Sequence, residues 1–146
     1  MARRAPRAGE FDLIARYFAP LAAKAPLAFG LTDDAALLRA TVGYDLVLKT
    51  DTIVGGVHFL VDDPPFSIGQ KLLRVNLSDL ASKGARPRVY LLNCTFPRDI
   101  DEAWIKAFAE GLAADQAAYG LVLVGGDTTA TDGPITLSAT VIGEVP

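Results

Sequence analysis

The N-terminal part of the chain carries hydrophobic residues at helical spacing. Four of them recur every three or four positions and would form one apolar face: Phe11, Ile14, Phe18 and Leu21. This pattern predicts a helix over about 10–24 that packs against the core through that stripe. Pro20 falls late in this helix and predicts a break or kink, because proline cannot continue the helical hydrogen-bond ladder.

Two longer helices are expected further along the chain. Ser67 with Gln70, and Asp99 with Glu102, match the spacing of a capping box, in which two side chains satisfy free N–H groups at a helix start. A glycine follows each helical run at its far end, where a left-handed residue commonly ends a helix. Together these signals predict two amphipathic helices.

Short apolar runs bounded by turn residues predict five strands, at about 35–39, 45–50, 88–96, 121–124 and 135–145. With the helices between them, they predict an α/β fold of the α+β type, in which a mixed sheet carries its helices on one face. Cys94 lies in one of the apolar runs. We interpret it as a buried structural thiol, since cysteine is among the most buried residue types.

Composition narrows the classes of protein that fit. The chain has 146 residues, of which 51% are hydrophobic and 21% charged, an ordinary globular balance. Its net charge of −3 argues against nucleic-acid binding through bulk positive charge. No run approaches the roughly 20 apolar residues that a membrane span requires. The single cysteine excludes an internal disulfide framework.

The two ends of the chain suggest where its domain begins and stops. Residues 1–8 carry three arginines and are expected to be a flexible N-terminus. They do not resemble a secretory signal, because no apolar block follows them, and we interpret the protein as cytoplasmic. The chain stops directly after its last expected strand, which motivates the hypothesis that it has been cut at a domain boundary.

The positions of the aspartates indicate where chemistry is expected. Asp33 and Asp34 lie in a loop before a strand, Asp51 at the end of a strand, and Asp127 after the pair Gly125-Gly126 at the end of another. Loops at strand ends commonly form the sites of α/β proteins. Oxygen ligands without a Cys or His cluster favour Mg²⁺ or Ca²⁺ over zinc. A glycine pair also lets a backbone approach a phosphate closely.

Asp79 extends this expectation to a helix. It continues the apolar stripe formed by Ile68, Leu72 and Val75, so the stripe would end in a carboxylate. Burying a lone carboxylate is costly unless it is paired or binds a metal. Asn76, three residues earlier, is placed to share the same site. If these carboxylates converge they repel one another, and cations would relieve that repulsion.

Each of these signals also has an ordinary structural explanation. The loop aspartates are common turn formers, and the glycine pair is compatible with a plain turn. Asp79 is compatible with half exposure or with pairing to Lys83 four residues later. His58, the only histidine, is of a kind that is more often structural or exposed than functional. The run 43–50 superficially suggests a phosphate-binding P-loop, but Leu48 stands where that motif requires glycine.

Several blocks of the sequence, in order over most of the chain, closely resemble the thiamine-monophosphate kinase family. They are Gly9-Glu10-Phe11-Asp12-Leu13-Ile14, Asp33-Asp34-Ala35-Ala36-Leu37, Thr50-Asp51-Thr52, Gly56-Val57-His58-Phe59, Val75-Asn76-Leu77-Ser78-Asp79-Leu80-Ala81 and Gly125-Gly126-Asp127-Thr128-Thr129. The wider superfamily includes aminoimidazole ribonucleotide synthetase, selenophosphate synthetase and a hydrogenase maturation factor. The block containing His58 points to the thiamine branch.

The resemblance implies an activity and an assembly. The activity is ATP-dependent phosphorylation of thiamine monophosphate to thiamine diphosphate. Members are homodimers whose N-terminal domains pair their sheets into a barrel, with the nucleotide near the dimer interface. Because members carry a second α/β domain, residues 9–146 would be the ATP- and Mg²⁺-binding N-terminal domain, and the C-terminal domain is absent from this chain. The fragment alone is then expected to dimerise and to be catalytically weak or inactive.

The resemblance also implies roles for individual residues. The positions that match Mg²⁺ ligands, several ions being expected, are Asp33, Thr50, Asp51, Asp79 and Asp127. The positions that match ATP contacts are Gly126 and Asp127. His58 matches a contact to the thiamine substrate. No catalytic base is assigned, because the acceptor phosphate is already ionised near neutral pH and catalysis would rest on positioning and charge neutralisation.

Three positions qualify the resemblance. Thr32 stands where many members have glycine, and Lys49 stands where members commonly have Ser or Thr, next to a metal-ligand position. A lysine there either reduces the number of bound cations or points away. Asp34 is assigned a supporting position behind the metal ligands. Two rival hypotheses stay open: another superfamily enzyme with a different acceptor, and a non-catalytic dimerisation or cation-binding module.

Overall fold

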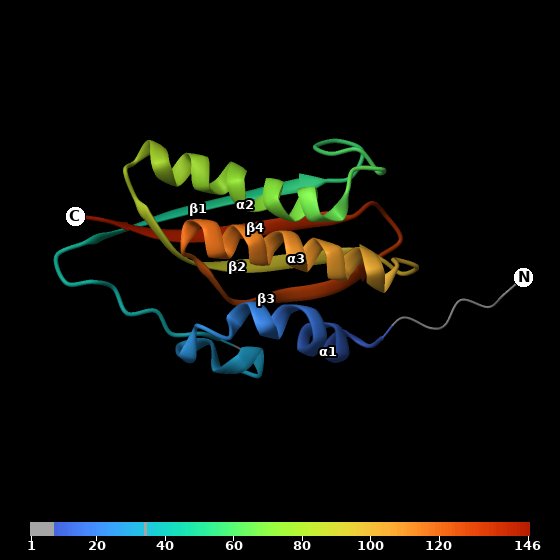
Figure 1. Ribbon diagram of the computed structural model, residues 1–146, viewed down its shortest axis with the longest axis horizontal. Helices are drawn as coiled ribbons and strands as arrows, with labels where there is room; N and C mark the ends of the chain where they lie inside the picture. Colours follow the sequence, from blue (N-terminus) through green and yellow to red (C-terminus); the bar gives the residue numbers. More distant parts are fainter. Residues whose placement is uncertain (1–7, 34) are drawn as a thin grey trace, which may run out of the picture.

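A single sheet with helices on one face forms the frame of the protein. The computed structural model describes residues 8–33 and 35–146. Its elements in chain order are α1 (Glu10–Leu13), η1 (Ile14–Phe18), η2 (Ala19–Ala22), η3 (Pro26–Leu31), β1 (Asp45–Val54), α2 (Pro65–Ser82), β2 (Arg86–Pro97), α3 (Glu102–Tyr119), β3 (Val122–Thr131) and β4 (Thr136–Val145). Helices α2 and α3 lie side by side over the sheet, and α1 lies beside β3 (Figure 1).

The sheet has four strands in the order β1-β4-β2-β3. Strand β4 pairs antiparallel with both β1 and β2, whereas β2 pairs parallel with β3. The parallel pair is joined through α3, as parallel neighbours require a crossover connection. The expected mixed sheet with helices on one face is therefore confirmed.

The alternation of side chains along β1 separates the two faces of the sheet. One set faces the helices and is partly or fully buried: Val47, Lys49, Asp51 and Ile53. The other set faces away from them and is more exposed: Leu46, Leu48, Thr50 and Thr52. Leu48 is 65% exposed, so this second face presents apolar as well as hydroxyl side chains to its surroundings.

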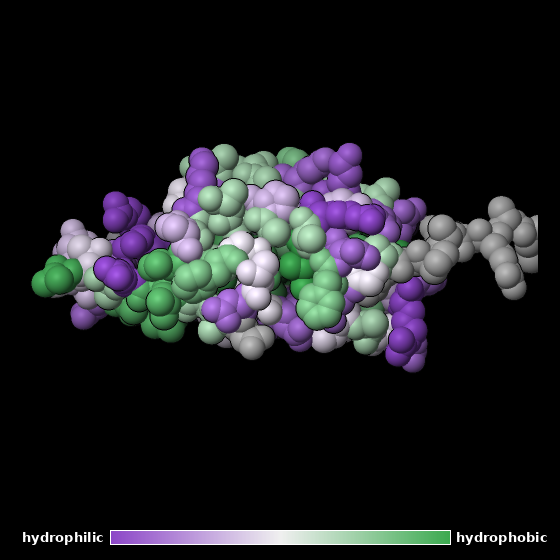
Figure 2. Space-filling view, turned by 90° about the horizontal axis from the view of Figure 1, so that it is seen from below, coloured by the Kyte–Doolittle hydropathy of each residue, from purple (hydrophilic) through white to green (hydrophobic). Residues whose placement is uncertain are grey.

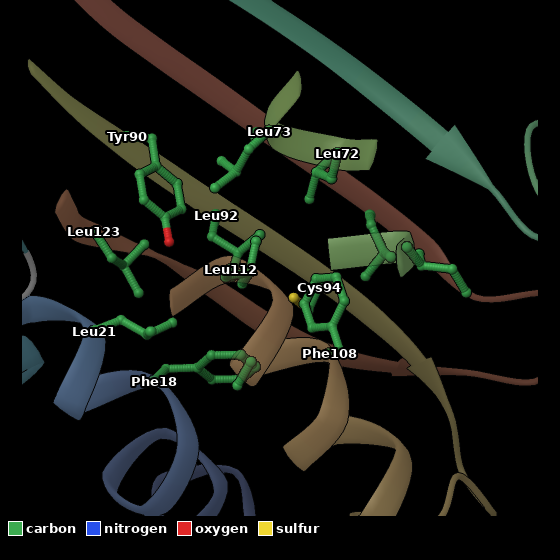
Figure 3. Close-up of a cluster of buried hydrophobic side chains, with 14 of the residues drawn as sticks. Phe18, Leu21, Leu72, Leu73, Tyr90, Leu92, Cys94, Phe108, Leu112 and Leu123 are labelled. Carbon is green, nitrogen blue, oxygen red and sulfur yellow. The ribbon is translucent and has the colours of Figure 1, made fainter. Parts of the chain in front are cut away.

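The core fills the space between the sheet and its two long helices. Tyr90, Leu92 and Cys94 of β2 point toward Phe108 and Leu112 of α3 (Figure 3). Cys94 is 1% exposed, and burial raises the pKa of its thiol well above the ordinary value. The interpretation of Cys94 as a buried structural thiol is therefore confirmed.

Close contact between α2 and α3 depends on glycine. A Cβ at Gly111 would lie 2.0 Å from the carbonyl oxygen of Phe66, and one at Gly69 would lie 2.5 Å from that of Phe108. Neither position has room for a side chain, so the two helices approach backbone to backbone. This contact fixes α2 against α3 and with it the position of Asp79 near the end of α2.

The expected helix over 10–24 is broken into three short pieces. Four residues are α-helical, five form a π-helical turn and four a 3₁₀ turn, with Pro20 in the first turn of the last piece. A helical segment and its break near the proline are therefore confirmed, but the segment is not a regular α-helix throughout. The expected apolar stripe also splits, because Phe18 is 3% exposed whereas Phe11 is 84% exposed.

Two expected strands differ from the structure. The segment 35–39 forms no strand, and the N–H of Leu37 donates a hydrogen bond to the carbonyl of Leu27. The short strand expected at 121–124 belongs to the longer β3, which continues through the glycine pair to Thr131. The apolar run covers only the first part of β3. The second part, from Gly125 onward, consists of glycine, polar and small residues but still pairs with β2.

The two expected capping boxes are wrong, although both helices exist. Helix α2 begins at Pro65 and Pro64 precedes it without a side-chain cap, while Gln70 donates a hydrogen bond to Asp115 instead. At α3 the cap is Asp101, whose carboxylate accepts a hydrogen bond from the N–H of Ala103. The polar residues at these sites are engaged in tertiary contacts or in an alternative cap.

Glu102, expected in the second capping box, ties the start of the chain to α3. It accepts hydrogen bonds from the Tyr17 hydroxyl at 3.0 Å and from the Ala8 N–H at 3.2 Å. The Tyr17 hydrogen bond is the main reason that the pKa of Glu102 is lowered. The expected flexible N-terminus covers residues 1–8, of which 1–7 lie outside the described residues and Ala8 is held by this contact.

None of the helices among residues 8–33 and 35–146 has the length and apolar character to cross a bilayer.

Candidate functional site

A groove of about 780 Å³ runs between the short N-terminal helices and the edge strand β3. Apolar side chains of α1 and η1, among them Phe11 and Ile14, form one wall, and the segment around Asp33 forms another. Leu91 of β2 and residues 123–128 of β3 supply the opposite side. Figure 2 views the molecule from the side on which α1 lies, where hydrophobic and hydrophilic residues are both exposed.

A β-bulge shapes the strand side of this groove. Tyr90 pairs with Leu123 but Leu91 pairs with Gly125, so β3 carries one extra residue, Val124, at this point. Gly126 follows with φ of 148°, and a Cβ there would lie 1.7 Å from the carbonyl oxygen of Leu92. Only glycine fits, which leaves a stretch of bare backbone along the groove.

Asp127 and Asp33 line the same groove from opposite sides. Asp127 lies within β3, not at the end of a strand as expected, and its exposed carboxylate accepts a hydrogen bond from the N–H of Thr128 at 2.9 Å. Asp33 is also exposed and follows η3. The structure therefore brings together Asp33, Gly126 and Asp127 from the predicted set.

An unusual backbone path leads to Asp33. Phe29, Gly30 and Leu31 have φ values of 51°, 66° and 60°, so three consecutive residues adopt left-handed conformations, two of them without the freedom of glycine. The Thr32 hydroxyl then donates a hydrogen bond to the carbonyl of Phe29 at 2.7 Å. Thr32 thus closes this turn, and Asp34, assigned a supporting position, lies outside the described residues.

A second acidic group lies on the helix-covered face at the opposite edge strand, β1. The ammonium of Lys49 is 3.1 Å from a carboxylate oxygen of Asp51 and 2.9 Å from one of Asp79. These hydrogen bonds, that to Asp79 first, raise the pKa of Lys49. We call these three residues the Lys49 cluster. One of the two alternatives for Lys49 was that its side chain points away from the predicted metal ligands. That alternative is wrong, because the side chain binds Asp51 and Asp79.

Of the alternatives for Asp79, burial at the end of the apolar stripe is wrong and half exposure is confirmed. Its side chain is 52% exposed, and Asn76 faces the core instead, fully buried. The Asn76 amide nitrogen donates to the carbonyl of Leu72, while its Oδ1 atom has no hydrogen-bond partner among the described residues. The helix therefore presents Asn76 and Leu80 to the core and turns Asp79 toward β1.

Thr50 belongs to neither group. Neighbouring residues on a strand point to opposite faces, so Thr50 faces away from Lys49 and Asp51. Its hydroxyl donates to the carbonyl of Ala139 at 3.2 Å and accepts from the Thr140 hydroxyl at 3.0 Å. Two strands separate β1 from β3, which places Thr50 about 14 Å from the Asp127 strand.

The predicted metal ligands therefore do not converge within one copy of the chain. Asp33 and Asp127 line the groove, Asp51 and Asp79 hold Lys49, and Thr50 lies on the open face. Among residues 8–33 and 35–146, no group of three or more His, Cys, Asp or Glu residues could hold a metal ion. The five residues that the sequence suggested as metal ligands therefore lie in three separate environments.

His58 lies in the turn that follows β1. Its Nδ1 atom accepts a hydrogen bond from the backbone N–H of Val54 at 3.1 Å. The backbone N–H of His58 donates to the Val54 carbonyl. Lys71 of α2 donates to the His58 carbonyl. With Nδ1 accepting, the neutral imidazole carries its proton on Nε2, which remains the atom available to a ligand.

A shallow cavity of about 690 Å³ adjoins the Lys49 cluster along α2. It contains two basic side chains, Lys71 and Arg74, that the sequence reasoning did not select. Arg74 binds Asp115, which is 1% exposed, through two hydrogen bonds of 2.8 and 2.9 Å. Phe11 and Ile14 were also missed as groove residues, because helical spacing alone assigned them to the core.

Comparison with known proteins places this geometry in a family. Residues 32–145 match the family described as AIR synthase related protein, N-terminal domain. The chain belongs to this family. Within it, the "Thiamine-monophosphate kinase" of Caulobacter vibrioides is 48% identical over 137 residues, 94% of this chain and 39% of that protein.

Solved structures agree with this membership. The crystal structure of thiamine-monophosphate kinase from Stenotrophomonas maltophilia K279a has a TM-score of 0.79 and 44% identity, covering 94% of this chain and 42% of that one. A structure of AaThiL complexed with AMPPCP and TMP has a TM-score of 0.69 and 30% identity, covering 77% and 36%. The resemblance to this kinase family is confirmed, and the chain spans about two fifths of the length of these relatives.

Proposed function

We propose that this chain is the nucleotide-binding N-terminal part of a cytoplasmic enzyme that transfers phosphate from ATP to thiamine monophosphate, giving thiamine diphosphate. The observation that carries the proposal is the groove in which Asp33, Asp127 and the bare backbone at Gly126 meet. The names of its relatives and the AMPPCP and TMP bound by AaThiL support it.

The groove suits a nucleotide because its two sides differ. Phe11, Ile14 and Leu91 offer apolar surface to a base, whereas Asp33 and Asp127 offer carboxylates near the glycine bulge. Backbone without side chains permits close approach of phosphate oxygens.

The carboxylates of Asp33 and Asp127 fit Mg²⁺, because both are exposed oxygen donors in one groove and Mg²⁺ typically uses one or two carboxylates together with water and phosphate. When bound, Mg²⁺ neutralises charge among the phosphates. The residues of this chain would orient the nucleotide, and no base is needed to activate an acceptor phosphate that is already ionised. Thr50, Asp51 and Asp79 stay weaker candidates for metal contact, since they lie outside this groove.

We extend the proposal to a homodimer that pairs its open sheet faces into a barrel. Three leucines on that face, Leu46, Leu48 and Leu91, are 40%, 65% and 38% exposed. They form an apolar surface that a second copy would cover. His58, at the adjoining turn, is proposed to contact the thiamine substrate. A monomer at tens of micromolar in sedimentation velocity would contradict the pairing.

The groove is tested by replacing Asp127 with Asn in the whole protein. We expect binding of AMPPCP with Mg²⁺, measured by calorimetry, to weaken at least about ten-fold, because a charge-assisted ligand is lost. Asp132→Asn is the matched control, since Asp132 is exposed and its ion pair is with an exposed arginine, Arg98. Unchanged binding in Asp127→Asn would overturn the groove assignment.

The acceptor is tested separately with the whole protein and a panel of phosphorylated acceptors. Formation of thiamine diphosphate from thiamine monophosphate is the expected result. Turnover of a different acceptor alone would favour another enzyme of the superfamily. Independent, non-cooperative binding of metal and nucleotide without turnover would favour a cation-binding or dimerisation module.

A further inference from the structure

The Lys49 cluster combines three charges in a geometry that the proposed metal chemistry does not use. Lys49 and Asp51 are two residues apart on β1 and face the helices, and Asp79 reaches them from the last turn of α2. The ammonium lies between the two carboxylates, at 3.1 and 2.9 Å. The ammonium therefore occupies the position between two acids at which a bridging cation would be expected.

Charge explains why a cation is needed there. Two carboxylates held close to one ammonium would repel each other without it. Asp79 also sits near the C-terminal end of α2, where the helix carries partial negative charge and an acidic side chain is unfavourable. The side chain of Lys49 is 30% exposed, less than the side chain of either aspartate. The compensating positive charge therefore comes from a residue of the protein itself.

A divalent ion fits this position poorly. Mg²⁺ requires oxygen ligands at about 2.0–2.1 Å in octahedral arrangement. An ion bridging these same carboxylate oxygens would lie beside the positive ammonium that already binds them. The Asp51–Asp79 pair therefore disagrees with its expected role as metal ligands.

We infer that the ammonium of Lys49 takes the place of a divalent cation between Asp51 and Asp79, so this pair recruits no metal of its own. Metal binding is then confined to the groove at β3. The inference deepens the proposed function by setting which carboxylates hold metal, and it rests on that function only for its catalytic consequence.

The test counts bound Mn²⁺, a spin-active substitute for Mg²⁺, by electron paramagnetic resonance of the 146-residue chain. Lys49→Gln removes the charge at similar length, Lys49→Arg keeps it, and Lys106→Gln removes a charge on α3 as the matched control. We expect Lys49→Gln to gain one Mn²⁺ bound at least about ten-fold more tightly than any ion at this pair in the parent. Lys49→Arg and Lys106→Gln should gain none.

Two results would overturn the inference: no additional ion in Lys49→Gln, or an additional ion in Lys49→Arg as well. The count uses Mn²⁺ without nucleotide or turnover. It therefore stands apart from the acceptor test, and failure to make thiamine diphosphate would leave its result intact.

A second measurement on the unaltered chain covers the case in which Lys49→Gln does not fold. Each lysine is labelled by reductive methylation and located by mass spectrometry, with and without saturating Mn²⁺. We expect Lys49 to react more slowly than Lys106 in both conditions, because its amine is held between two carboxylates. A rise of Lys49 to the rate of Lys106 on adding Mn²⁺ would show that the metal displaces the ammonium, and the inference would fail.

Discussion

The two edges of the sheet treat their acidic residues differently. At β3, Asp127 and Asp33 line a groove whose backbone is kept bare by the bulge at Gly126. At β1, Asp51 and Asp79 are bound to a lysine from the same strand. All four aspartates match metal-ligand positions in the family resemblance, but the ammonium of Lys49 already binds Asp51 and Asp79. Whether a carboxylate is a candidate metal ligand therefore depends on which cationic side chains the fold places beside it.

The largest expected effect distinguishes a buried residue of the groove, Phe18, from an exposed one, Phe11. Phe18→Ala should lower the free energy of unfolding by about 3–5 kcal/mol, because it removes a buried aromatic side chain. Phe11→Ala, at an exposed position on the same side, should change it by no more than about 0.5 kcal/mol while weakening nucleotide binding. Urea unfolding and calorimetry measure the two quantities. Equal destabilisation by both substitutions would show that Phe11 is part of the core.

Gly126→Ala should have the next largest effect. A methyl group would overlap the Leu92 carbonyl, and the strand would have to move, which we expect to cost about 2–3 kcal/mol. Gly133→Ala is the control, since its added atom would meet only a side-chain oxygen at 3.4 Å. Urea unfolding compares the two variants, and a stability near that of the parent for Gly126→Ala would mean that the bulge is not rigid.

Glu144 provides a third acidic environment, which is buried and fully partnered. It accepts hydrogen bonds from the N–H and hydroxyl of Thr41 and pairs with Arg88. The Thr41 N–H first, then the hydroxyl and Arg88, lower its pKa. The native state therefore binds the proton less readily than the unfolded state, so the stabilisation is complete above the ordinary glutamate value of about 4.3 and is lost as the pH falls below it.

Glu144→Gln tests that sign. The variant should have a lower melting temperature at neutral pH, and its melting temperature should fall less steeply than that of the parent as the pH drops below about 4. Thermal unfolding followed by circular dichroism at several pH values measures both. Parallel acid limbs in parent and variant would contradict the role of Glu144.

The smallest effect is expected at the Lys49 cluster. Asp79→Asn removes one partly exposed ion pair and should lower stability by less than about 1 kcal/mol, with the difference shrinking in high salt. Glu110→Gln, which breaks an exposed pair on α3, is the control. A loss above about 2 kcal/mol in urea unfolding would mean that the cluster behaves as a buried network and would remove the contrast with an exposed surface pair.

Local patterns predicted the elements better than their ends. The two long helices and the mixed sheet followed from periodicity, and Gly120 ends α3 in a left-handed conformation as expected. The capping boxes failed because Gln70 and Glu102 bind residues distant in sequence. Strand 35–39 failed because an apolar run becomes a strand only where another strand pairs with it, and none of the described strands pairs with this segment.

The candidate site shows a similar division. Sequence reasoning selected Asp33, Gly126 and Asp127, which the fold brings to one groove. Sequence reasoning could not separate these from Asp51 and Asp79. The difference depends on the face of β1 on which Lys49 lies and on which side of α2 faces β1, and both are set by tertiary packing. Lys49 was noticed as a departure, but its ion pairs depend on tertiary packing. The burial of Asn76 in place of Asp79 has the same origin.

The position of β4 has a consequence for the order of folding. This strand follows the other three described strands in the sequence, yet it lies between β1 and β2 and is the only described strand that pairs with β1. Its pairings with β1 join residues about ninety positions apart, so their contact order is high. On a ribosome, β1 must wait unpaired until residue 145 has emerged from the exit tunnel. Premature termination within β4 would therefore leave an exposed strand edge and an aggregation-prone chain.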